Sequence, residues 1–193
     1  MSQANTETTV TETTATQTAA TSAEQQEAMQ ALYKRTLGSF PTGVTVVMAH
    51  DEDGQVNGLT ASAFTALSMD PPLVLVCPQY NSESYRTLTS ASHFSINILA
   101  DGQATEAFAF AKKGDAKRDA ISALDITSGA SGAPVLAGAV ATMECSHWHE
   151  YEGGDHAILI GRIEHMHCND EQTPMVYCRG AFSALHTPEE AMA

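Results

Sequence analysis

Histidine and cysteine side chains gather in two segments of the C-terminal third, with a spacing that suits metal ligation. The first segment holds Cys145, His147 and His149, and the second holds His165 and His167. Residues two apart in a strand face the same side of a sheet, so the histidines of each segment can share one face. The chemistry that this pattern suggests is a metal site.

The expected hairpin keeps these two segments apart. With a turn at Gly153-Gly154, His147 lies opposite Ile160. In the same register His165 lies opposite Thr142, which is five residues from His147 along the strand. At ~3.3 Å per residue this is roughly 17 Å, too far for two ligands of one ion. We therefore expect no metal and interpret these residues as exposed or half-buried strand histidines, with a metal-binding module as an alternative.

Charge and cysteine content exclude several classes of protein. The 193 residues include 23 acidic and 9 basic side chains, a net charge of −14, which argues against binding to nucleic acid or anionic membranes. No apolar run reaches the ~18–20 residues of a membrane helix. The first basic residue is Lys34, so we expect no signal peptide and a cytoplasmic protein. The four cysteines lack C-x-x-C spacing and are expected to be free thiols.

The common nucleotide-binding motifs are absent from the sequence. No two of the thirteen glycines are separated by a single residue, so G-x-G-x-x-G does not occur. No glycine precedes a lysine, which excludes the phosphate-binding loop of nucleotide hydrolases. Neither G-x-S-x-G nor H-E-x-x-H occurs. A nucleotide cofactor must therefore bind outside the usual parallel-sheet motifs.

The elements that position these residues are predicted to be mostly strands. Residues 1–23 form a threonine-rich segment with almost no large apolar side chain, so we expect it to be disordered. The folded domain is expected over 24–187, beginning with a helix over 24–37, and 188–193 form a C-terminal tail. Strands are predicted at 44–48, 55–62, 73–77, 94–99, 135–151, 156–167 and 175–185, and helices at 83–91 and 105–113.

This order of elements favours one fold class. Regular alternation of strand and helix is absent, which argues against a doubly wound parallel sheet. We predict a mainly β protein, an antiparallel barrel with two or three short helices. Four of the nine basic residues fall within Lys112–Arg118, and in so acidic a chain this run is a candidate anion-binding site. We interpret it instead as a solvent-exposed helix end.

Six short segments follow one another in an order that points to a known family. They are Phe40–Val47, Asn57–Phe64, Ser68–Val76, Asn81-Ser82, Phe94–Leu99 and Gly154–His156. Together they resemble the flavin reductase family, whose members supply reduced flavin to two-component monooxygenases. The resemblance spans about residues 32–185 and implies a Greek-key, FMN-binding split β-barrel.

The resemblance implies a flavin site made from three of these segments. A helix that begins near Ser82 would attract the flavin phosphate through its free N–H groups, with Arg86 adding positive charge. Gly43 would let the backbone approach the ring edge, because glycine has no Cβ. Taken alone, the same residues form an ordinary strand end and helix cap. The implied flavin-binding residues are Pro41, Thr42, Gly43, Val44, Thr60, Ala61, Ser62, Ala63, Asn81, Ser82 and Ser84.

The segment Gly154-Asp155-His156 is implied to bind the nicotinamide nucleotide. The composition is also that of an ordinary hairpin turn. In the implied role His156 donates a hydrogen bond to the dinucleotide and Asp155 fixes the geometry of the imidazole ring.

The resemblance also implies the reaction and its partners. Hydride passes from NADH or NADPH to FMN or FAD, and the protein acts by positioning the two cofactors, without a catalytic residue of its own. A homodimer is implied, with diffusible transfer of reduced flavin to a monooxygenase and no contact with nucleic acid or membrane. The alternative within the same fold is a flavin carrier or sensor that lacks reductase activity.

Overall fold

The computed structural model describes residues 8–185, and the chain divides into two units between Pro41 and Thr42. The C-terminal tail over 188–193 and residues 1–7 lie outside the described residues. Over its described residues the first unit contains one helix, α1 (Thr8–Leu37). This helix covers the one predicted over 24–37 and extends back into the segment for which the sequence favours disorder. Four alanines between residues 15 and 23 supply the helix propensity that offsets the threonines there.

The second unit is built on a seven-stranded sheet in the order β3-β2-β6-β9-β10-β5-β4. Every neighbouring pair is antiparallel, which confirms the predicted antiparallel, mainly β fold. The strands are β2 (Thr45–His50), β3 (Val56–Ala61), β4 (Phe64–Met69), β5 (Pro72–Val76), β6 (His93–Ile98), β9 (Ala141–Gly153) and β10 (His156–Cys168).

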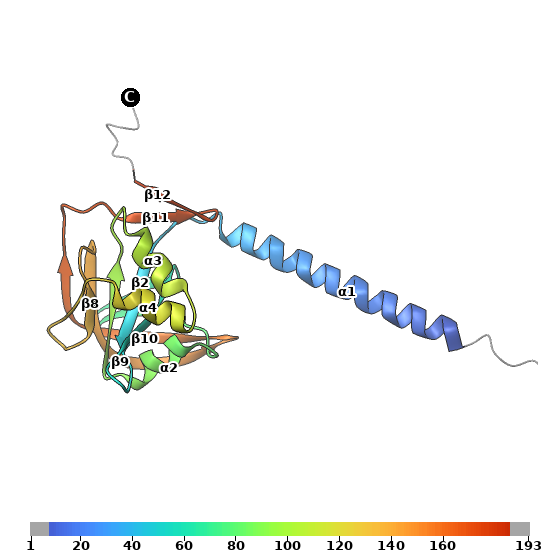
Figure 1. Cartoon of the computed structure of the whole chain (residues 1–193), viewed down its shortest axis with the longest axis horizontal. Coiled ribbons are helices and arrows are strands. Elements are labelled where there is room, and N and C mark those ends of the chain that lie inside the picture. The colour runs from blue at the N-terminus through green and yellow to red at the C-terminus, as the bar shows by residue number, and fades with distance from the viewer. Residues whose placement is uncertain (1–7, 186–193) are drawn as a thin grey trace, which may run out of the picture. The chain divides into compact units, whose positions relative to one another are not determined.

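Two small sheets and three short helices complete this unit. One sheet joins β1 (Thr42–Gly43), β11 (Met175–Cys178) and β12 (Ala181–Ala184), and the other joins β7 (Ile126–Ser128) and β8 (Pro134–Leu136). The helices are α2 (Glu83–Ser90), α3 (Ala104–Ala111) and α4 (Asp115–Ser122), of which α3 and α4 lie side by side (Figure 1). No helix in the described range is long and apolar enough to cross a membrane.

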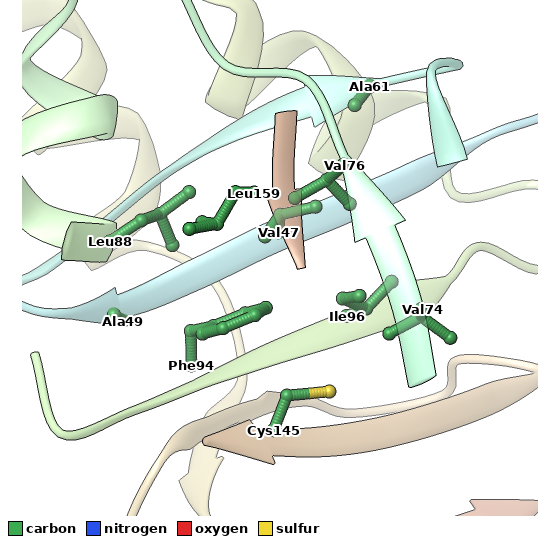
Figure 2. Packing of buried hydrophobic residues seen from close by; sticks show 10 residues of the cluster. All are labelled: Val47, Ala49, Ala61, Val74, Val76, Leu88, Phe94, Ile96, Cys145 and Leu159. Carbon is green, nitrogen blue, oxygen red and sulfur yellow. The ribbon is translucent and has the colours of Figure 1, made fainter. Parts of the chain in front are cut away.

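Alternating side chains of β2 serve two hydrophobic cores. Val47 and Ala49 point into the core that the curved sheet encloses, where they pack with Phe94 of β6 and Leu159 of β10 (Figure 2). Val46 and Met48, on the opposite face, belong to a second core that also includes side chains of α3, α4 and β8. Because a strand places successive side chains on opposite faces, β2 can be buried on both sides. This arrangement fixes α3 and α4 against one wall of the barrel.

The hairpin between β9 and β10 turns one residue later than predicted. Gly153 pairs with His156, so the turn is Gly154-Asp155 rather than Gly153-Gly154. Gly154 has a φ of 75°, which suits a tight two-residue turn and requires glycine. Two irregularities in the register then bring His147 opposite Gly161 and His165 opposite Glu144. Among residues 8–185, no group of three or more His, Cys, Asp or Glu side chains is arranged to hold a metal ion.

A buried carboxylate on β9 holds the loop between β7 and β8. The Glu144 carboxylate accepts hydrogen bonds from the Ala130 N–H (3.0 Å), the Ser131 N–H (2.6 Å) and the Ser131 hydroxyl (2.5 Å). A Cβ at Gly129 would lie 2.5 Å from the carboxylate, so a larger residue there would displace the Glu144 side chain. Burial raises the pKa of Glu144, but the hydrogen bonds from Ser131 and Ala130 outweigh it and hold the pKa below its ordinary value.

Replacing Glu144 with glutamine is expected to lower the free energy of unfolding at pH 7 by about 2 kcal/mol, because hydrogen bonds to a charged acceptor are lost. Since the folded pKa is lowered, the contribution of Glu144 is complete above the unfolded pKa and disappears as the pH falls through the folded pKa. The difference between wild type and Glu144→Gln should therefore shrink when urea unfolding is repeated at acidic pH. The exposed Glu152→Gln on the same strand is the control, and a similar loss in that variant would refute the assignment.

Candidate active site

A cleft of about 650 Å³ in the barrel unit lies between β3, the start of α2 and the segment that joins α3 to α4. Apolar surface comes from Leu59 and Phe110, and positive charge comes from lysines on the α3–α4 side. Eight of the residues that the sequence singled out line this cleft: Thr60, Ala61, Ser62, Ala63, Asn81, Ser82, Ser84 and His156.

The other predicted residues do not line this cleft. Thr42 and Gly43 form β1, which pairs with β11, and the Thr42 hydroxyl is buried without a hydrogen-bond partner. Val44 is buried in the second core. Pro41 belongs to the first unit. Gly154 and Asp155 form the hairpin turn, so of this tripeptide only His156 reaches the cleft.

Helix α2 begins at the edge of the cleft because Ser82 caps it. The Ser82 hydroxyl accepts a hydrogen bond from the Tyr85 N–H at 3.0 Å and donates to the Gln79 carbonyl at 2.7 Å. Glu83 in the first turn suits the positive end of the helix dipole. The remaining N–H groups of the first turn have no partner within the helix. This end of the cleft is therefore suited to an anionic group such as a phosphate.

The hydroxyl groups along the cleft are engaged in holding its walls together. The Thr60 hydroxyl donates to the Ala107 carbonyl of α3 at 2.5 Å. The Ser84 hydroxyl donates to the carbonyl of Gly58 on β3. These contacts join β3 to α3 and to α2, so Thr60 and Ser84 fix the shape of the cleft.

The sequence analysis considered the lysines of this run as an anion-binding site but kept the interpretation that they are exposed to solvent. Lys112 and Lys113 are exposed and line the cleft, whereas Lys117 is buried at its base. The interpretation of this run as a solvent-exposed helix end was therefore wrong for Lys117. The available signal was the concentration of basic residues in one segment of an acidic chain. Arg86, expected beside a phosphate, lines a second cleft of about 430 Å³ instead.

His156 is oriented by its neighbour in the turn. Its Nδ1 lies 2.7 Å from the Asp155 carboxylate, and this hydrogen bond and the imidazole charge hold the pKa of Asp155 below its ordinary value. The backbone of His156 also forms an isolated β-bridge with Gln79, which lies in the segment between β5 and α2. With Nδ1 bound to Asp155, Nε2 is the ring nitrogen left for a ligand.

Comparison with known proteins identifies the family to which this chain belongs. The family described as flavin reductase like domain matches residues 37–186. The chain belongs to this family. Among relatives, the actinorhodin polyketide dimerase of Streptomyces coelicolor is 36% identical over 158 residues, which cover 82% of this chain and 88% of that protein. HsaB of Rhodococcus jostii, the reductase subunit of a flavin-dependent monooxygenase, is 33% identical over 153 residues, or 79% and 76% of the two chains.

A solved structure of the same family resembles this one closely. It is the NADH:FAD oxidoreductase SgcE6 of Streptomyces globisporus, in complex with NAD and FAD fragments. The TM-score is 0.76 at 35% sequence identity, and the match covers 83% of this chain and 94% of that one. The likeness therefore extends over most of both chains.

Proposed function

We propose that this protein is an NADH:flavin oxidoreductase that reduces FMN or FAD and supplies the reduced flavin to a monooxygenase. The observation that carries the proposal is the cleft in which His156 meets the N-terminus of α2 and the lysines after α3. Membership of the flavin reductase-like family supports it. The likeness to an NADH:FAD oxidoreductase favours a reductase over a carrier or sensor of the same fold.

The chain's own residues bind and orient in this reaction. The first turn of α2, with Lys112 and Lys113, offers donors and positive charge to the flavin phosphate. Leu59 and Phe110 offer apolar surface to the flavin ring. His156, held by Asp155, donates a hydrogen bond to the nicotinamide nucleotide. The bound flavin itself supplies the hydride acceptor, so the protein requires no nucleophile or general base.

The acceptor of the reduced flavin is proposed to be a separate monooxygenase component. The relative HsaB is named as such a reductase subunit. Because this chain is strongly acidic, we propose transfer by diffusion rather than through a tight complex with another acidic protein. A homodimer is proposed as the working assembly.

NADH oxidation followed by absorbance tests the function. The purified protein is expected to consume NADH at a rate that rises with added FMN or FAD, because flavin leaves the cleft between turnovers. Parallel assays with NADPH, and with each flavin alone, define both cofactors. If flavin binds but neither nucleotide is oxidised, the reductase proposal fails and the carrier alternative takes its place.

A further inference from the structure

Lys117 occupies an unusual position at the base of the cleft. Its side chain is buried, with 7% of its surface exposed, and it lies on α4 behind the first turn of α2. The ammonium group donates to the Ser84 hydroxyl at 2.9 Å and to the carbonyl of Gly58. Lys117 thus contacts the two elements, α2 and β3, that form the walls of the cleft.

Stability alone does not explain a lysine at this position. Burial opposes the charged form and lowers the pKa of Lys117 to about 8, although the nearby Glu83 raises it in part. The Gly58 carbonyl already accepts a hydrogen bond from Ser84, so it needs no second donor. A buried charge is often less stabilising than an apolar side chain of similar size. The position of the charge therefore points toward a ligand.

We propose that the buried ammonium group of Lys117 is an electrostatic determinant of flavin-nucleotide affinity, acting on the flavin phosphate from behind the first turn of α2. This inference rests on the proposed function. Lys117 is 2.9 Å from Ser84, the second residue of α2, so its charge adds to the positive end of that helix at the point where a phosphate fits. Because the group is buried, its field is screened less by salt than that of an exposed lysine.

Other titratable groups face Lys117 from both sides. Those on the flavin cleft are Cys77, Glu83, Lys112, Lys113 and His156. Those on the second cleft, which Lys117 also lines, are Asp51, Glu52, Asp53, Arg86 and Arg118. Burial raises the pKa of the Cys77 thiol above its ordinary value.

The test compares FMN with riboflavin, which has the same ring and no phosphate. Replacing Lys117 with methionine removes the charge and keeps the length of the side chain. We expect FMN affinity to fall roughly tenfold or more in this variant, the size of one well-placed charge interaction at an effective dielectric of ~20. Riboflavin affinity should stay within about twofold of wild type, since the ring has no charge for Lys117 to attract.

High salt distinguishes the effect of Lys117 on FMN affinity from that of the exposed lysines. Lys113→Met is also expected to weaken FMN binding, but its effect should largely disappear at ~1 M salt, where the Debye length is about 3 Å. The effect of Lys117→Met should persist at the same salt concentration. Thermal unfolding of both variants checks that the fold is intact.

The wild-type protein gives an independent readout that needs no variant. A phosphate binds the charged ammonium group more tightly, so FMN affinity should be highest below pH 8 and fall as the pH rises to 9. Riboflavin affinity should not change over this range, and Lys117→Met should abolish the dependence for FMN.

Each other outcome overturns the inference. Equal losses for FMN and riboflavin in Lys117→Met would assign the residue a purely structural role. An unchanged FMN affinity, or a flat wild-type pH profile, would remove the electrostatic role and leave the reductase function in place. A wild-type protein that binds no flavin would refute the proposed function and this inference together.

Discussion

Gly58→Ala is expected to destabilise the barrel by at least about 3 kcal/mol and to abolish flavin binding with it. A Cβ at Gly58 would lie 2.1 Å from the Val47 carbonyl oxygen and 2.7 Å from the Met48 Cα. These are backbone atoms of the neighbouring strand β2, whose side chains fill both cores. The added methyl group can therefore be accommodated only if β2 and β3 move apart.

The same separation would open the base of the cleft. The Gly58 carbonyl accepts hydrogen bonds from both Ser84 and Lys117, so a shift of β3 disrupts the contacts to α2 and α4. Urea unfolding measures the loss of stability. FMN titration of the remaining folded protein measures how well the cleft still binds flavin. Gly43→Ala is the control, because a Cβ there meets no atom within 4 Å. A Gly58→Ala protein as stable as Gly43→Ala would contradict this account.

The barrel could be predicted from the sequence because its strongest strands carry strong local signals. The β-branched run of β2 and the apolar run Leu73–Cys77 identify buried strands without reference to the rest of the chain. The hairpin turn was misplaced by one residue, since either pair of residues in Gly153-Gly154-Asp155 suits a tight turn. The local sequence does not distinguish these two turns. Bulges in the middle of the strands shift the pairing further along the hairpin.

The sequence analysis singled out hydroxyl-bearing residues that line the cleft, but it did not show what their hydroxyl groups contact. Thr60 and Ser84 lie on the cleft as expected. Their hydroxyl groups nevertheless donate to carbonyls of α3 and β3, contacts between segments 47 and 26 residues apart. Lys117 was missed for the same reason, since only the packing of α4 against β3 shows that this lysine is buried. Long-range contacts of this kind leave no local pattern in a single sequence.

His156→Ala is expected to lower kcat/KM for NADH about 100-fold, because the side chain proposed to position the dinucleotide is lost. FMN affinity should change much less, since the positive charge and helix N-terminus proposed to hold the phosphate remain. Steady-state NADH oxidation at saturating FMN, together with a separate FMN titration, distinguishes the two effects.

Asp155→Asn tests whether the effect of His156 depends on its orientation. The asparagine oxygen can still accept the hydrogen bond from Nδ1, but the charge that favours this imidazole geometry is removed. We therefore expect an intermediate loss of roughly three- to tenfold in kcat/KM for NADH, smaller than that of His156→Ala. Because Asp155 does not line the cleft, FMN affinity should equal that of wild type. Parallel losses of NADH turnover and FMN affinity in both variants would mean that the turn shapes the flavin site, and would refute a separate nicotinamide role.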